Sequence, residues 1–180
     1  IYGMETTFFR FSETEKDNKK VLSTSSLSIL FSTLLFLGVA WIFRTDIAAA
    51  MGYEDRLHYI SWFILILSLE ALSSIPFAYL RQQNKARVFV SLKMINIGIN
   101  LGLNLFFILY CPMVIKAGSA HFLFEFTNSF FQADELVQYI FISNLIASAL
   151  TFGLLLPIFR YMRLGFSMDL WKRMMPYALP

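Results

Sequence analysis

Long stretches without charge alternate with short charged connections along this chain. Four stretches, 21–43, 57–80, 94–115 and 136–159, each have 22 to 24 residues and together contain one charged side chain, Glu70. A helix needs about 20 mostly apolar residues to cross a hydrocarbon core roughly 30 Å thick. Lipid cannot satisfy backbone N–H and C=O groups, and the stretches lack the alternation of barrel strands. The pattern therefore predicts four transmembrane helices.

The two ends of the chain follow other patterns. Segment 1–9 is short and apolar with Glu5 inside it, and we interpret it as the last turns of a further helix. Segment 160–180 alternates basic with apolar residues, which predicts an amphipathic connection on a membrane surface, with another helix beginning near Pro176. We therefore expect an all-α, polytopic transmembrane bundle, with a partial bundle over 1–159 and a cytoplasmic linker plus the start of the next helix over 160–180.

Composition supports a membrane setting. Hydrophobic residues make up 57% and charged residues 15% of the 180 residues, against about 25% charged in a typical soluble domain. This excludes a soluble globular domain and a disordered chain. Cys111 is alone, so no internal disulfide is expected. The first residue is Ile rather than Met, and we expect the chain to be a piece of a longer protein.

The basic residues predict an orientation, because cytoplasmic loops are enriched in Lys and Arg. The connections 10–20, 81–93 and 160–173 contain 12 of the 15 basic residues, and the connections 44–56 and 116–135 contain 3. The larger set is Arg10, Lys16, Lys19, Lys20, Arg81, Lys85, Arg87, Lys93, Arg160, Arg163, Lys172 and Arg173, and the smaller is Arg44, Arg56 and Lys116. We expect the first three connections to be cytoplasmic. Such basic residues beside the membrane suit anionic lipid headgroups better than nucleic acid.

The outer connection 116–135 is rich in Phe, and we expect a short helix there at the outer interface. His58 and His121 both fall on the outer side but on different connections, so we interpret them as interfacial aromatics rather than a metal site. We find no Gly-rich phosphate loop, no His/Cys cluster with metal-ligand spacing and no Ser-His-Asp set on one membrane side. No metal, cofactor or covalent chemistry is expected.

Glu70 is the most unusual residue of the spans. It is the fourteenth of the 24 residues in 57–80, about 2 Å from the middle of the helix. A carboxylate there must face protein or water, with Lys93 as a candidate partner. Two interpretations of Glu70 stay open. It is either a protonatable group in a transport pathway or a residue that makes a polar contact with a neighbouring helix. Pro76 should kink the helix, and three serines can satisfy freed carbonyl groups: Ser68, Ser73 and Ser74.

Three asparagines form a second polar feature. Asn96, Asn100 and Asn104 recur every four residues on one helix face, and Gly98 and Gly102 form a small-xxx-small pair on another. Amide side chains hydrogen-bond across helices, and glycines let helices approach closely. The stripe therefore serves helix packing or, alternatively, lines a hydrophilic path for a headgroup or sugar.

Glu5 and Arg10 are the charged residues of the first segment. They lie five residues apart, so they are not an ideal helical ion pair. Arg10 lies at the inner boundary, where it is either a snorkelling topology anchor or a contact for a lipid diphosphate.

Three segments resemble a known family. YGMETTFFRF (2–11) is similar to the end of the second helix of bacterial polysaccharide and O-antigen flippases. IPFAYLRQQNKARVFVSLKMINIGINLGLNLFF (75–107) resembles the join between their fourth and fifth helices, and WKRMMPYALP (171–180) the entry to the seventh. These flippases belong to the multidrug/oligosaccharidyl-lipid/polysaccharide exporter superfamily.

The resemblance implies a function. Family members have two six-helix bundles around a cavity, and they move lipid-linked oligosaccharides across the bacterial inner membrane by alternating access. By this mapping Glu5 and Arg10 contact substrate, whereas Glu70, Lys93, Asn96, Asn100 and Asn104 are coupling or buried polar residues. The partners would be the lipid-linked oligosaccharide, membrane lipids and the remainder of the same transporter. The alternatives are a drug exporter of the same superfamily, a membrane-embedded polysaccharide-processing enzyme, and a structural or assembly subunit.

Overall fold

The computed structural model describes residues 3–15, 17–118, 123–131, 136–162 and 165–178. These residues form helices joined by turns, without a β-strand. The helices are α1 (Met4–Thr14), α2 (Asn18–Ile42), α3 (Arg44–Ala50), α4 (Leu57–Gln82), α5 (Ala86–Leu105), α6 (Cys111–Ala117), α7 (Phe124–Phe130), α8 (Leu136–Leu155) and α9 (Met168–Ala178). Short turns of tighter or wider helix extend three of them: η1 (Glu54–Arg56), η2 (Phe106–Tyr110) and η5 (Leu156–Tyr161).

The four predicted spans are confirmed as helices that are long and apolar enough to cross a membrane. They are Asn18–Ile42, Glu54–Gln82, Ala86–Ala117 and Leu136–Tyr161. The third is continuous through η2 and α6, because η2 is a π-helical turn. Pro112 lacks the N–H that would bond the carbonyl of Ile108, and a widened turn accommodates such a break.

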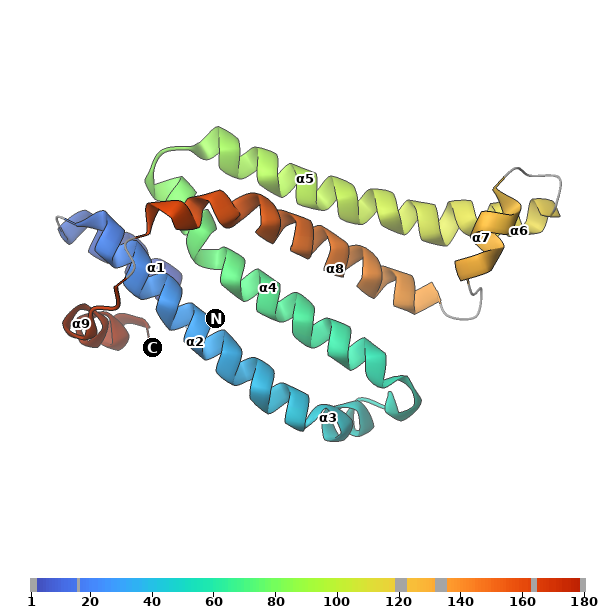
Figure 1. The fold of residues 1–180 in the computed structure, drawn as a ribbon, viewed down its shortest axis with the longest axis horizontal. Helices are drawn as coiled ribbons and strands as arrows, with labels where there is room; N and C mark the ends of the chain where they lie inside the picture. Colours follow the sequence, from blue (N-terminus) through green and yellow to red (C-terminus); the bar gives the residue numbers. More distant parts are fainter. Residues whose placement is uncertain (1–2, 16, 119–122, 132–135, 163–164, 179–180) are drawn as a thin grey trace.

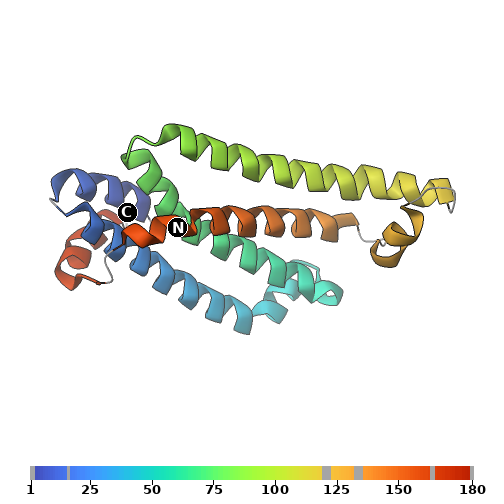
Figure 2. The ribbon, with the colours of Figure 1, turned by 45° about the horizontal axis from the view of Figure 1, so that its top comes forward.

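The four long helices lie side by side in the order α2, α4, α8, α5, each running opposite to its neighbours in the chain (Figure 1). α1 and α9 pack at one end of this bundle, against each other and against α2 (Figure 2). The connections rich in basic residues gather at that same end, as the sequence predicts. Lys16 and Arg163, two members of the basic set, lie outside the described residues. α7 is the expected short helix of the opposite end.

α9 differs from the expectation for segment 160–180. It buries Leu170, Met174 and Ala178 in a cluster with α1, α2 and α4, so this side of the helix packs on protein. Pro176 lies inside α9, and the prediction that a helix begins there is wrong. Apolar side chains that recur every four residues are buried along α9. Their burial stabilises the helix by more than the loss of the one hydrogen bond that Pro176 removes near its end.

Pro76 lies inside α4, which changes direction before it reaches α5 (Figures 1 and 2). The nearby serines donate to carbonyl groups three or four residues back: Ser68 to Ile64 at 2.8 Å, Ser73 to Leu69 at 2.8 Å and Ser74 to Ala71 at 2.7 Å. The carbonyl that Pro76 deprives of its donor belongs to Leu72, so these bonds do not replace the missing one. They do satisfy the hydroxyl groups inside an apolar helix.

Candidate functional site

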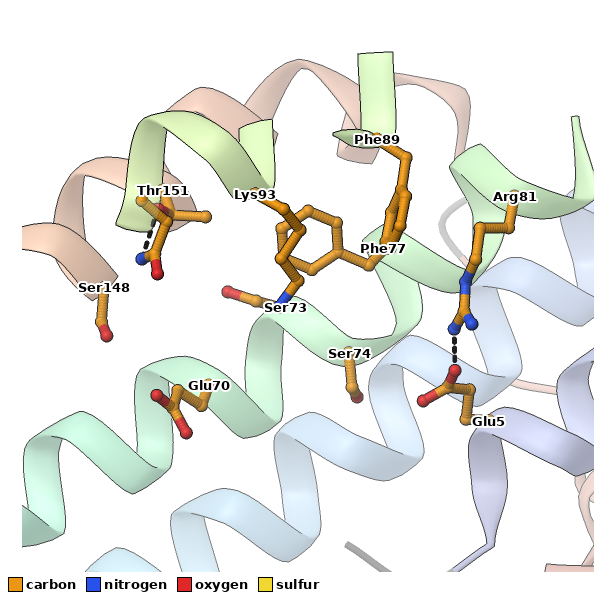
Figure 3. A pocket seen from close by; sticks show the side chains of 11 residues that line it. Glu5, Glu70, Ser73, Ser74, Phe77, Arg81, Phe89, Lys93, Ser148 and Thr151 are labelled. Atoms are coloured by element: carbon orange, nitrogen blue, oxygen red, sulfur yellow. Dashed lines mark hydrogen bonds and ion pairs between the residues drawn. The ribbon is translucent and has the colours of Figure 1, made fainter. Parts of the chain in front are cut away.

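A polar cavity of about 330 Å³ lies between α1, α4, α5 and α8, toward the basic end of the bundle (Figure 3). Its lining carries two acidic and two basic side chains among hydroxyl, amide and aromatic groups. The lining residues are Glu5, Glu70, Ser73, Ser74, Phe77, Arg81, Phe89, Lys93, Asn96, Ser148 and Thr151. Four of the seven residues singled out from the sequence, Glu5, Glu70, Lys93 and Asn96, therefore come together here.

One face of α4 supplies almost half of this lining. Glu70, Ser73, Ser74, Phe77 and Arg81 follow the spacing i, i+3, i+4, i+7 and i+11. At 100° per residue this spacing keeps all five side chains on one side of a helix. The polar face of α4 therefore leads from the middle of the span to its basic end.

Arg81 is the cavity's most tightly placed cation. Its Nη2 donates to Oε1 of Glu5 on α1 (Figure 3). Its guanidinium carbon lies 5.2 Å from the ring centre of Phe9 and 5.3 Å from that of Phe89. Arg81 therefore ties α1, α4 and α5 together by one ion pair and two cation–π contacts. The sequence places Arg81 in the basic connection 81–93, and its spacing from Glu70 is the signal that puts it on the polar face of α4.

Glu70 and Lys93 share the cavity without forming a direct ion pair. The Lys93 ammonium instead lies 4.5 Å from the ring centre of Phe77. Glu70 is exposed in the described chain, and it also lines a second hollow of about 300 Å³ between α2 and α4. The expectation that Glu70 and Lys93 form an ion pair is therefore wrong. Both side chains line one cavity, but the ammonium group of Lys93 lies over the ring of Phe77.

Three hydroxyl groups of the cavity use their hydrogens within their own helices, so their lone pairs remain for other partners. Ser73, Ser74 and Thr151 each donate to a carbonyl of their own helix. Asn96 Nδ2 donates to Thr151 Oγ1 at 2.9 Å, which links α5 to α8. Since a hydroxyl has one hydrogen and two lone pairs, these groups can accept further hydrogen bonds. The cavity therefore offers acceptors together with the cationic donors Arg81 and Lys93.

The remaining predicted residues lie elsewhere. The guanidinium of Arg10 stacks over Tyr177 of α9, 4.1 Å from its ring centre, and is not part of the cavity lining. Asn104 donates to Asn100 on the same helix at 2.6 Å. An added Cβ at Gly98 or Gly102 would meet no atom within 4 Å. The asparagine stripe thus divides into one interhelical contact and one pair within α5.

Metal ligands do not gather in the part of the chain that the structure describes, where no three His, Cys, Asp or Glu side chains come together. His58 packs edge-on against Tyr59 and Trp62 near the start of α4. His121, the other histidine, lies outside the described residues.

No protein-family model, curated protein or solved structure matches this chain. The cavity and the bundle that holds it are therefore the physical basis for assigning a function.

Proposed function

We propose that this chain forms part of a membrane transporter that moves lipid-linked oligosaccharide from the inner to the outer leaflet of a bacterial inner membrane. The observation that carries the proposal is the charged cavity between α1, α4, α5 and α8, set in a bundle of otherwise apolar spans. Charged groups within a membrane span are costly, and they commonly mark a path for a polar substrate. The resemblance of segments 2–11, 75–107 and 171–180 to flippases supports the same function.

The chemistry of the cavity suits such a substrate. Arg81 and Lys93 supply positive charge for a diphosphate, and the arginine fork can bind two phosphate oxygens at once. The carboxylates and hydroxyl oxygens accept hydrogen bonds from sugar hydroxyls. The hydrocarbon tail of the substrate stays in the bilayer, so the protein supplies a polar path only for the head. Transport is then a conformational cycle, and no catalytic residue or cofactor takes part.

The proposed setting follows from the charges. The end with α1, α9 and the α4–α5 connection lies in the cytoplasm, because it carries most of the basic residues. The partners are the lipid-linked oligosaccharide, membrane lipids and the rest of the same transporter. Many transporters build their path between structural repeats, and the second bundle would close the open side of the cavity.

Deleting the gene in its own bacterium tests the function. We expect surface polysaccharide to be lost while the lipid-linked precursor accumulates on the cytoplasmic side, and both should be restored by the wild-type gene. A change in glycan length without precursor accumulation would instead indicate a polysaccharide-processing enzyme. Altered drug sensitivity with normal surface glycan would indicate a drug exporter. Normal glycan and normal precursor levels would contradict a role in export.

Two arginine variants of the full-length protein test the residues. Arg81→Ala should abolish export at unchanged protein abundance, because it removes the guanidinium group that Glu5 holds at the cavity. Arg10→Ala separates a substrate contact from a topology anchor, since Arg10 stacks on Tyr177 outside the cavity. If export survives Arg10→Ala, Arg10 is an anchor. If it survives Arg81→Ala, the cavity is not the diphosphate site.

Glu70→Gln tests proton coupling in the same transporter. The amide keeps the size of the side chain. Unlike the carboxyl group, it cannot bind and release a proton in the two hollows that Glu70 lines. We expect the pH dependence of transport to disappear in this variant. Transport that keeps its normal pH dependence would contradict a coupling role for Glu70.

A further inference from the structure

An apolar groove of about 630 Å³ lies between α2 and α9. The α2 wall is formed by Leu27, Phe31 and Leu35, which follow one another at helical spacing. The α9 wall is formed by Met168, Trp171 and Met175, with Phe166 just before the helix. Phe31 and Leu35 are largely exposed, so the groove opens to the outside of the bundle.

Hydrogen bonds from Trp171 and Ser32 fix the walls of the groove. Trp171 Nε1 donates to Ser28 Oγ at 2.9 Å, which holds the indole ring against α2. Ser32, the other hydroxyl of the lining, donates to the carbonyl of Ile29 at 3.0 Å. On its other face α9 buries Leu170 and Met174 in the core. The groove is therefore a built feature of the fold rather than a gap between loose helices.

The groove extends from the basic end into the hydrocarbon region. Leu27 and Leu35 lie 6 and 14 residues beyond Val21, where the uncharged part of α2 begins. At 1.5 Å per residue these positions are about 9 and 21 Å along the helix. Half of the core is about 15 Å thick, so hydrocarbon chains of the adjoining leaflet reach the depths of Leu27 and Phe31, and Leu35 lies beyond the middle of the core.

Basic side chains flank the groove at its shallow end. Lys20 precedes Leu27 by seven residues and so lies on the same side of α2, within about 20°. Lys172 follows Met168 by four residues, about 40° around α9. Both lysines are exposed, and neither forms an ion pair among the described residues. Arg173 pairs with Glu15 at 2.7 Å, and Asp169 lies farther round α9, about 100° from Met168.

We propose that the groove between α2 and α9 binds an anionic phospholipid, with hydrocarbon chains against Leu27, Phe31 and Trp171 and a phosphate headgroup at Lys20 and Lys172. The charge of the rim selects the anionic headgroup, because basic residues beside the membrane attract anionic lipids. The apolar walls and their depth select hydrocarbon. This site goes beyond the proposed function, since it requires only that the basic end lies at an anionic leaflet.

Fluorescence quenching by brominated lipid tests the site in the full-length protein. The protein is reconstituted in two sets of vesicles with equal amounts of phosphatidylglycerol and phosphatidylcholine. In one set only the phosphatidylglycerol chains carry bromine, and in the other only the phosphatidylcholine chains. Membrane charge is therefore the same in both. The signal of Trp171 is the difference between the wild type and Trp171→Phe.

We expect the Trp171 signal to be quenched about twofold or more strongly by brominated phosphatidylglycerol than by brominated phosphatidylcholine. Lys20→Gln combined with Lys172→Gln should make the two lipids equal. Lys85→Gln combined with Arg87→Gln removes the same charge at the same end of the bundle, away from the groove, and should leave the preference intact. Equal quenching in the wild type would overturn the proposal, as would no quenching, which would indicate a protein helix in the groove.

Native mass spectrometry supplies a second measurement that does not depend on Trp171→Phe. Wild-type protein extracted in mild detergent should retain one more phosphatidylglycerol than the Lys20→Gln/Lys172→Gln variant. The Lys85→Gln/Arg87→Gln variant should resemble the wild type. Equal lipid retention in all three proteins would contradict a site at the α2–α9 groove.

Discussion

Three asparagines spaced four residues apart on α5 make two different kinds of hydrogen bond. Asn96 reaches Thr151 on α8 at 2.9 Å, whereas Asn104 and Asn100 bond each other at 2.6 Å on the same helix. A bond between helices is lost when the helices separate, but a bond within one helix survives separation. Asn96 should therefore stabilise helix association, and Asn100 should not.

Asn96→Ala should lower the free energy of unfolding by about 0.6–1.7 kcal/mol, the range of interhelical hydrogen bonds in membranes. Thr151→Val should cost a similar amount, and the double variant should cost no more than either single one. Denaturant unfolding in detergent micelles measures these values. Asn100→Ala is the matched control and should leave the α5–α8 association unchanged. An equal loss from Asn96→Ala and Asn100→Ala would contradict the distinction.

Two glycines show how the surroundings of a helix decide the effect of a methyl group. Gly3 lies at the start of α1, where an added Cβ would be 3.3 Å from the carbonyl oxygen of Ala178 in α9. The Gly3 N–H also donates to that oxygen at 2.7 Å. Gly98 lies in the middle of α5 with nothing within 4 Å of an added Cβ. The same substitution should therefore change stability in opposite directions at these positions.

Gly3→Ala should destabilise the packing of α1 on α9 by about 1 kcal/mol or more, because a tight backbone contact must open. Gly98→Ala should stabilise the protein by about 0.5–1 kcal/mol, because alanine loses less backbone entropy in a helix. Thermal unfolding in detergent shows the sign of each change. Destabilisation by Gly98→Ala would mean that another helix packs closely on this face of α5.

The elements differ in how far the sequence predicts them. The spans follow from charge-free length alone, because hydrocarbon thickness sets that length whatever the neighbours are. The polar face of α4 is also encoded locally, by the spacing from Glu70 to Arg81. The partner of Arg81 is not, since Glu5 lies 76 residues away and only packing of α1 on α4 brings it close. The start of α9 is not encoded locally either, because it depends on burial against α1 and α2.

At the scale of the whole molecule, charge is distributed along the axis of the bundle. The α4–α5 connection, α1 and α9 lie at one end, and α3 lies at the other, between α2 and α4 (Figure 1). The described basic residues of the larger set belong to the first end. Each basic residue that must cross the membrane adds to the cost of insertion, so we expect the less basic end to be the one that crosses. The charged cavity and the lipid groove both belong to the basic end and should face the cytoplasm.

Single cysteines introduced into a Cys111→Ala background test this orientation. Met51→Cys and Gln83→Cys are matched sites, because both residues are exposed, both are uncharged and they lie at opposite ends of α4. A membrane-impermeant maleimide should label Met51→Cys in intact cells. It should label Gln83→Cys only after the membrane is permeabilised. The opposite result would place Arg81 and Lys93 at the outer surface, where a cavity that takes its substrate from the inner leaflet could not begin its cycle.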